Sequence, residues 1–96
     1  MSLDKNKKIR KIRKKLDILD NKLLNIIKIR TTLVHKILMN KKTKNQIIDR
    51  KRINKILKNI RKKSIKKKID TELTKRIWGN MIKAYINFEY RKFKKK

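Results

Sequence analysis

The fold is decided by residues 9–37, which read IRKIRKKLDILDNKLLNIIKIRTTLVHKI. Apolar residues recur here in heptads, in one series of Ile9, Leu16, Leu23 and Ile37 and a second of Ile12, Leu19, Ile26 and Leu33. This spacing places both series along one stripe of an α-helix. We therefore predict a helix from about Lys5 to about Asn40, which would be about 50 Å long.

A helix of this length needs a partner. The chain has 96 residues, so we expect a single domain over residues 1–96 with a modest core. Such a domain cannot cover the long helix from end to end, and an uncovered apolar stripe indicates an interaction surface. The simplest partner is a second copy of the chain, which predicts a homodimer.

Two further helices follow a polar stretch at residues 41–48. Asp49 is a suitable N-cap for a helix that runs to about Ser64, and Asp70, with Glu72 in the first turn, is suitable for one that runs to about Phe93. No window alternates as a strand does, and the chain has no Pro and a single Gly. The expected fold class is all-α, with apolar positions at Ile53, Ile56, Leu57 and Ile60, then Leu73, Ile77, Trp78, Met81, Ile82, Tyr85, Ile86 and Phe88.

The charge balance is extreme, with 34 Lys plus Arg against 7 Asp plus Glu and a formal net charge of +27. Such a chain attracts polyanions, so a basic helical nucleic-acid-binding protein is one alternative function. However, the charge is spread over the whole length, and the chain is rich in Lys, Ile and Asn together. The many lysines are then explained by a general bias of the composition toward Lys at exposed positions, and we expect no specific nucleic-acid partner.

Several classes of chemistry lack the residues they need. There is no Cys, and His35 is the only His, so we expect no metal and no thiol chemistry. No apolar run approaches the ~20 residues of a membrane span, and the N-terminus has no signal-peptide core. These observations predict a cytoplasmic protein without a membrane partner or a cofactor.

Arg30 is a charge at an apolar position. It continues the series Ile9, Leu16 and Leu23 at the next heptad step. Burying an unpaired guanidinium costs several kcal/mol, and no acidic residue lies near it at helical spacing. Either the aliphatic part of the Arg30 side chain lies along the apolar surface so that the guanidinium reaches solvent, or the guanidinium binds an anionic ligand.

Three more cations lie beside apolar positions, namely Arg13, Lys41 and Arg52. Each could be a solvated charge, but together with Arg30 they indicate an anion pocket. Arg13 and Arg30 are about 25 Å apart along a straight helix, so one ligand cannot touch both in a single chain. In a crossed dimer, Arg13 of one chain could reach the pocket of the other.

Glu89 is the second anomaly, because it continues the third helix's stripe after Ile82 and Tyr85. It could pair at the surface with Lys92 or another cation. Alternatively, its carboxyl group points into the pocket.

These residues occur in a familiar order. The first helix carries Arg13-Lys-Lys-Leu-Asp17-Ile-Leu-Asp20, then Arg30, then Lys41. The second carries Asp49-Arg-Lys-Arg52, and the third carries the segment from Ile77-Trp78 to Tyr85-Ile-Asn-Phe-Glu89. Over about residues 9 to 92, this pattern resembles the all-α chorismate mutases.

The resemblance implies an intertwined homodimer of three-helix chains with two sites. In each site Arg13 would come from the partner, and Arg30, Lys41, Asp49, Arg52 and Glu89 from the home chain. The chain departs from the family at Ile53, where Glu is usual, and at Tyr85, where a small hydroxyl residue is common. An apolar residue and a Tyr at these positions are also similar to isochorismate–pyruvate lyases, so that activity is an alternative, with Ile53 and Tyr85 among the substrate-binding residues.

The implied reaction, the rearrangement of chorismate to prephenate in aromatic amino acid biosynthesis, needs no nucleophile, metal or redox cofactor. Its dicarboxylate substrate calls for permanently charged, bidentate donors, which favours Arg13 with Arg52 or Arg30. Negative charge grows on the ether oxygen in the transition state, and Lys41 is the first candidate donor to it. Glu89 could be the second only when protonated, because a carboxylate would repel that oxygen.

Overall fold

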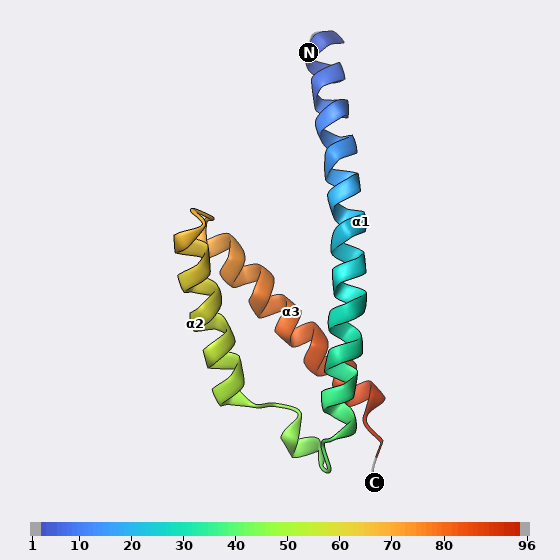
Figure 1. Cartoon of the computed structure of the whole chain (residues 1–96), viewed down its shortest axis with the longest axis vertical. Coiled ribbons are helices and arrows are strands. Elements are labelled where there is room, and N and C mark those ends of the chain that lie inside the picture. Colours follow the sequence, from blue (N-terminus) through green and yellow to red (C-terminus); the bar gives the residue numbers. More distant parts are fainter. Residues whose placement is uncertain (1–2, 95–96) are drawn as a thin grey trace. The chain divides into compact units, whose positions relative to one another are not determined.

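A computed structural model describes residues 3–94 of the chain (Figure 1). The elements are α1 (Leu3–Met39), a short 3₁₀ helix η1 (Lys44–Gln46), α2 (Arg50–Lys66) and α3 (Thr71–Lys92). No strand occurs in residues 3–94, so the all-α prediction with three helices and a long first helix is confirmed.

The predicted helix boundaries differ from the structure at the ends. α1 ends at Met39, α3 at Lys92, and α2 continues to Lys66, two residues past the predicted end at Ser64. The 3₁₀ helix inside the polar stretch was not expected. None of the helices in the described part of the chain combines the length and apolarity that crossing a membrane requires.

The chain divides into two compact units, residues 1–34 and 35–96. The first unit consists of the body of α1. Six of its apolar heptad residues are more than half exposed, namely Ile12, Leu16, Leu19, Leu23, Ile26 and Leu33 at 52–61%. The predicted apolar stripe is therefore present on α1 and is not covered by its own unit.

The second unit is built around the pair α2 and α3, which pack against each other as a hairpin (Figure 1). Its buried apolar side chains are Leu38 and Ile47, each 3% exposed. Near the turn of the hairpin, the hydroxyls of Ser64 and Thr74 share a buried hydrogen bond of 2.8 Å. A buried polar contact therefore joins the two helices beside their connection, and the sequence analysis did not predict it.

Both predicted N-caps are confirmed. The Asp49 carboxylate accepts a hydrogen bond of 3.0 Å from the Arg52 backbone N–H. The Asp70 carboxylate accepts from the backbone N–H groups of Glu72 and Leu73 at 2.8 and 3.1 Å. These bonds satisfy donors that a helix start leaves without partners, which fixes where α2 and α3 begin.

α2 ends in a Schellman motif. The Ile69 N–H donates to the Ser64 carbonyl at 2.9 Å, and the Lys68 N–H donates to the Ile65 carbonyl at 3.1 Å. Lys68 occupies the left-handed position of this motif with φ 58°, where Gly is the usual residue. A side chain with a Cβ atom is strained in this conformation by roughly 1–2 kcal/mol.

Replacing Lys68 with Gly should therefore stabilise the protein. We expect Lys68→Gly to raise the free energy of unfolding by about 0.5–1 kcal/mol, since the relieved strain exceeds the added flexibility of the unfolded chain. Urea denaturation followed by circular dichroism measures this change. Lys67→Gly is the matched control, because Lys67 has φ −87° and gains nothing from Gly. An equal gain in both variants would contradict the explanation.

Candidate active site

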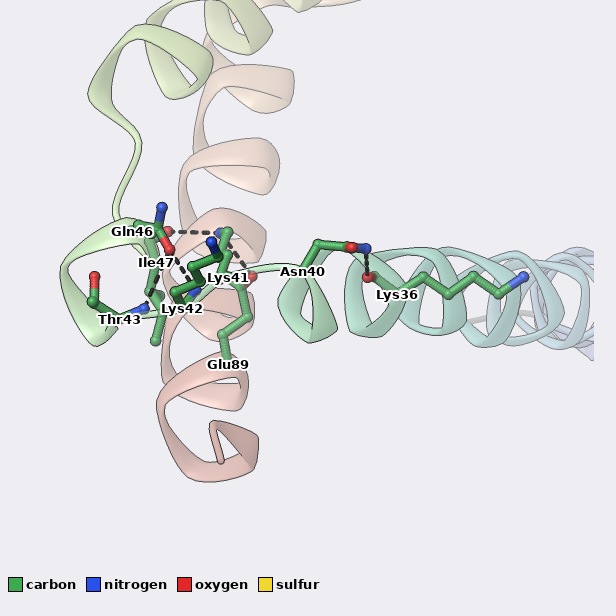
Figure 2. Close-up of polar contacts among 8 residues, drawn as sticks. All are labelled: Lys36, Asn40, Lys41, Lys42, Thr43, Gln46, Ile47 and Glu89. Atoms are coloured by element: carbon green, nitrogen blue, oxygen red, sulfur yellow. Dashed lines mark hydrogen bonds and ion pairs between the residues drawn. The ribbon is translucent and has the colours of Figure 1, made fainter. Parts of the chain in front are cut away.

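The centre of the candidate site is a contact between Lys41 and Glu89. The Lys41 ammonium donates to Glu89 Oε1 at 3.2 Å and lies 3.4 Å from the Ile47 carbonyl oxygen (Figure 2). Glu89, on α3, is 7% exposed, and the Lys41 side chain is 18% exposed. Glu89 therefore pairs with the pocket lysine rather than at the surface with Lys92, as one reading of the sequence allowed.

The segment after α1 positions Lys41. The Asn40 and Lys41 N–H groups donate to the carbonyls of Ile37 and Leu38, both at 3.0 Å, so the chain leaves α1 through a tight last turn. The Gln46 side-chain oxygen accepts from the backbone N–H groups of Lys42 and Thr43, the latter at 3.2 Å. This folds the segment back so that Ile47 is buried and its carbonyl faces the Lys41 ammonium (Figure 2).

The pair has a defined electrostatic function. A buried carboxylate is costly unless a counter-charge and hydrogen bonds compensate it, and Lys41 supplies both to Glu89. An ammonium has three N–H donors. Its contacts with Glu89 and Ile47 in the described structure use two of them, which leaves one for the oxygen of a ligand. Lys41 is thus a preorganised donor rather than a freely moving surface lysine.

An open depression of about 560 Å³ adjoins Lys41. It is lined by Lys41, Gln46, Ile48, Asp49, Arg50 and Lys51. Cationic side chains outnumber the single carboxylate in this lining, so the depression favours an anionic ligand. Among residues 3–94, no group of three or more His, Asp or Glu side chains is placed to hold a metal ion.

The predicted residues of α2 lie at its first two turns. Asp49 lines the depression, but its carboxylate also caps the helix through the Arg52 N–H. The Arg52 side chain is exposed and Ile53 is half-buried. The structure thus places Asp49 beside Lys41 and leaves the Arg52 guanidinium accessible to a ligand.

Tyr85 lies on α3 one helical turn before Glu89 and is half-buried. Its ring packs edge-on against Phe88, with centroids 6.2 Å apart and an interplanar angle of 84°. Because residues four apart share a helix face, Tyr85 lies on the same side of α3 as Glu89. This is the side that the sequence assigned to the pocket.

Arg13 and Arg30 belong to the first unit. Both lie on α1, Arg13 exposed and Arg30 half-buried. Their roles as ligand-binding residues stay predictions.

Sequence reasoning missed Gln46 and Ile47. Gln46 shapes the segment that carries Lys41, and Ile47 contributes a backbone carbonyl to its ammonium. The spacing Thr43-x-x-Gln46, which is typical of a capping box, was an available signal for Gln46. No sequence signal identifies which backbone carbonyl will meet a given lysine.

The fold and this site define a class: a small helical protein in which a lysine is held by a buried glutamate at the edge of a depression lined mostly by cations. Residues 12–90 match the family model of chorismate mutase type II. The chain therefore belongs to the chorismate mutase type II family and is an enzyme of the isomerase class. Searches of curated proteins and of solved structures gave no match.

Proposed function

We propose that this protein converts chorismate to prephenate by holding the substrate folded and stabilising the charge of its transition state. Membership of the family and the part-buried contact between Lys41 and Glu89 support this proposal. The reaction is intramolecular, so the protein needs to supply only orientation and electrostatics. Its role would be in aromatic amino acid biosynthesis.

Lys41 is the proposed donor to the ether oxygen. As the C–O bond breaks, negative charge accumulates on that oxygen, and a preorganised N–H donor lowers the barrier most when it does not have to reorganise. The contacts of Lys41 with Glu89 and Ile47 support this role, because they fix the ammonium before substrate arrives.

Glu89 is the proposed second donor, in its protonated form. The carboxylate that accepts from Lys41 in the free protein would repel a developing oxyanion at the same place. As a neutral acid, Glu89 would donate its O–H to the ether oxygen. Lys41 would interact with both Glu89 and the substrate throughout.

This role predicts the effects of two substitutions. Glu89→Gln keeps a side-chain N–H donor at the same position and should remain active. Glu89→Leu removes the donor and should lower kcat/KM by about 10²-fold or more.

Steady-state measurements of kcat/KM for both variants test this expectation. Glu72→Gln is the matched control, since Glu72 lies on the same helix but is exposed and paired with Arg76 at 2.9 Å. Equal activities of Glu89→Gln and Glu89→Leu would remove Glu89 from this role.

The two substrate carboxylates would be held by arginines. Arg52 and Arg30 come from the home chain, and Arg13 comes from a second copy in an intertwined homodimer. The uncovered apolar stripe of α1 supports this assembly, because large apolar side chains more than half exposed along one face call for a partner. The sites are incomplete without the partner under this proposal.

An isochorismate–pyruvate lyase on the same scaffold is the second candidate. The apolar Ile53 and the Tyr85 ring favour it. Mutases usually have a Glu directly after the arginine that corresponds to Arg52, and its carboxylate binds the substrate hydroxyl, whereas this chain has Ile53 there. The same lysine and arginines would hold isochorismate.

Product analysis separates these functions. The purified protein is incubated with chorismate or isochorismate, and the products are separated by chromatography. Prephenate from chorismate, with little pyruvate from isochorismate, is the expected result. Faster release of pyruvate and salicylate from isochorismate would establish the lyase, and consumption of neither would overturn both functions and favour the nucleic-acid alternative.

A further inference from the structure

The outer face of α2 carries a row of lysines to which the proposed reaction assigns no role, although its first member, Lys51, also lines the depression beside Lys41. They recur at intervals of three or four residues, and all are exposed: Lys51, Lys55, Lys58, Lys62 and Lys66. At 100° per residue they fall within an arc of about 80°, and the row is about 22 Å long. Ile53, Ile56 and Ile60 lie on the opposite side of α2 and are half-buried.

No acidic residue neutralises this row within its own segment. Residues 50–69 contain no Asp and no Glu. The cations also continue toward α3, since Lys58, Arg61 and Lys75 line a hollow of about 250 Å³ together with Leu57, Ile60 and Thr71. Like charges one turn apart destabilise a helix, so a bound polyanion would relieve repulsion that α2 otherwise retains.

We propose that the lysine row of α2 binds the phosphate backbone of nucleic acids without reading their sequence. Lysine ammonium groups neutralise phosphates as point charges, and a straight row of them matches a linear polyanion. α2 has no aromatic residue to stack on bases. We therefore expect the affinity for nucleic acid to depend on salt concentration and not on base composition. The proposed binding does not depend on the mutase reaction.

A nucleic acid fits this face better than a membrane does. Helices that lie on membranes insert several large apolar side chains beside their cations. In the described structure, Ile65 is the one large apolar side chain of α2 that is exposed. The row is therefore a surface contact for phosphates rather than a face that inserts into lipid.

The row can be tested apart from the candidate active site. Lys58 lies six residues beyond Arg52, and Lys66 is at the other end of the helix. The test variant is Lys58→Gln/Lys62→Gln/Lys66→Gln. The matched control is Lys7→Gln/Lys14→Gln/Lys28→Gln, which removes the same charge from exposed positions on α1, on the side away from its heptad stripe.

Fluorescence anisotropy with a labelled duplex of arbitrary sequence measures binding over a range of salt concentrations. The α2 variant should bind roughly tenfold or more weakly at physiological salt, and its slope of log K against log salt should be smaller by about 2–3, as expected for three lost phosphate contacts. In the α1 variant, the slope of log K against log salt should change by less than the loss of one phosphate contact would cause. Both variants should keep the activity on chorismate.

Three results would overturn the proposal. Equal losses in the two variants would mean that net charge alone drives binding. A large preference between duplexes of different sequence would mean base recognition, and displacement of the duplex by phosphatidylserine vesicles at matched charge would mean a membrane surface. If the triple variant does not fold, the single reversal Lys62→Glu compared with Lys14→Glu gives the same comparison.

Discussion

Lys41→Met should reduce kcat/KM for chorismate by about 10²–10³-fold, which corresponds to the loss of about 2.7–4 kcal/mol of transition-state stabilisation from one preorganised donor. Methionine has nearly the length of lysine but no N–H group. The change therefore removes the proposed donor to the ether oxygen while it keeps much of the side-chain volume. Steady-state kinetics on the purified variant measure the effect.

The control is the neighbouring residue. Lys42 is exposed, and only its backbone N–H contacts Gln46, so Lys42→Met should retain near-normal activity. Comparable losses in the two variants would show that position 41 has no special role.

Stability requires a second variant. Lys41→Met leaves Glu89 buried without its counter-charge, and an unpaired buried charge can cost 3–5 kcal/mol. Lys41→Met/Glu89→Gln removes both charges and should fold while remaining inactive. High activity in this double variant would contradict the proposed roles of both residues.

Mixing two inactive variants should restore activity. Arg13→Ala and Arg30→Ala should each fall to roughly 1% of normal activity or less, because each removes a proposed carboxylate clamp. In a mixed dimer, the site that uses Arg30 of the first variant receives Arg13 from the second. That site is intact, and the other site lacks both arginines.

The recovered activity is predictable. Random pairing makes half of the dimers mixed, and half of their sites are intact, so activity should return to about a quarter of normal. Co-expression of differently tagged chains, followed by purification and kinetics, measures it. If Arg13 acted within its own chain, no mixed dimer would contain an intact site, and the mixture would stay inactive.

Local signals in the sequence predicted much of the fold. Asp49 and Asp70 fixed the starts of α2 and α3 because an N-cap acts on donors two or three residues away. The heptads of residues 9–37 predicted the length of α1 for a similar reason, since helical periodicity repeats within one segment.

Contacts between distant residues were harder to predict. Lys41 and Glu89 were each identified as candidates for the pocket, but their contact joins residues 48 positions apart. The hydrogen bond between Ser64 and Thr74 and the contact of Lys41 with the Ile47 carbonyl were not anticipated. They depend on how the backbone closes in three dimensions, and hydrophobic periodicity does not contain that information.

Because the apolar core is small, the thermal stability of this protein should depend on its concentration. Leu38 and Ile47 are the buried apolar residues of the described part of the chain, whereas much of the heptad stripe is uncovered. If a second copy provides the missing burial, stability follows mass action, and the midpoint of thermal unfolding should climb as the protein is concentrated. The folded fraction would then depend on how many chains are present, so the level of expression would itself set the fraction of the enzyme that is folded in a cell.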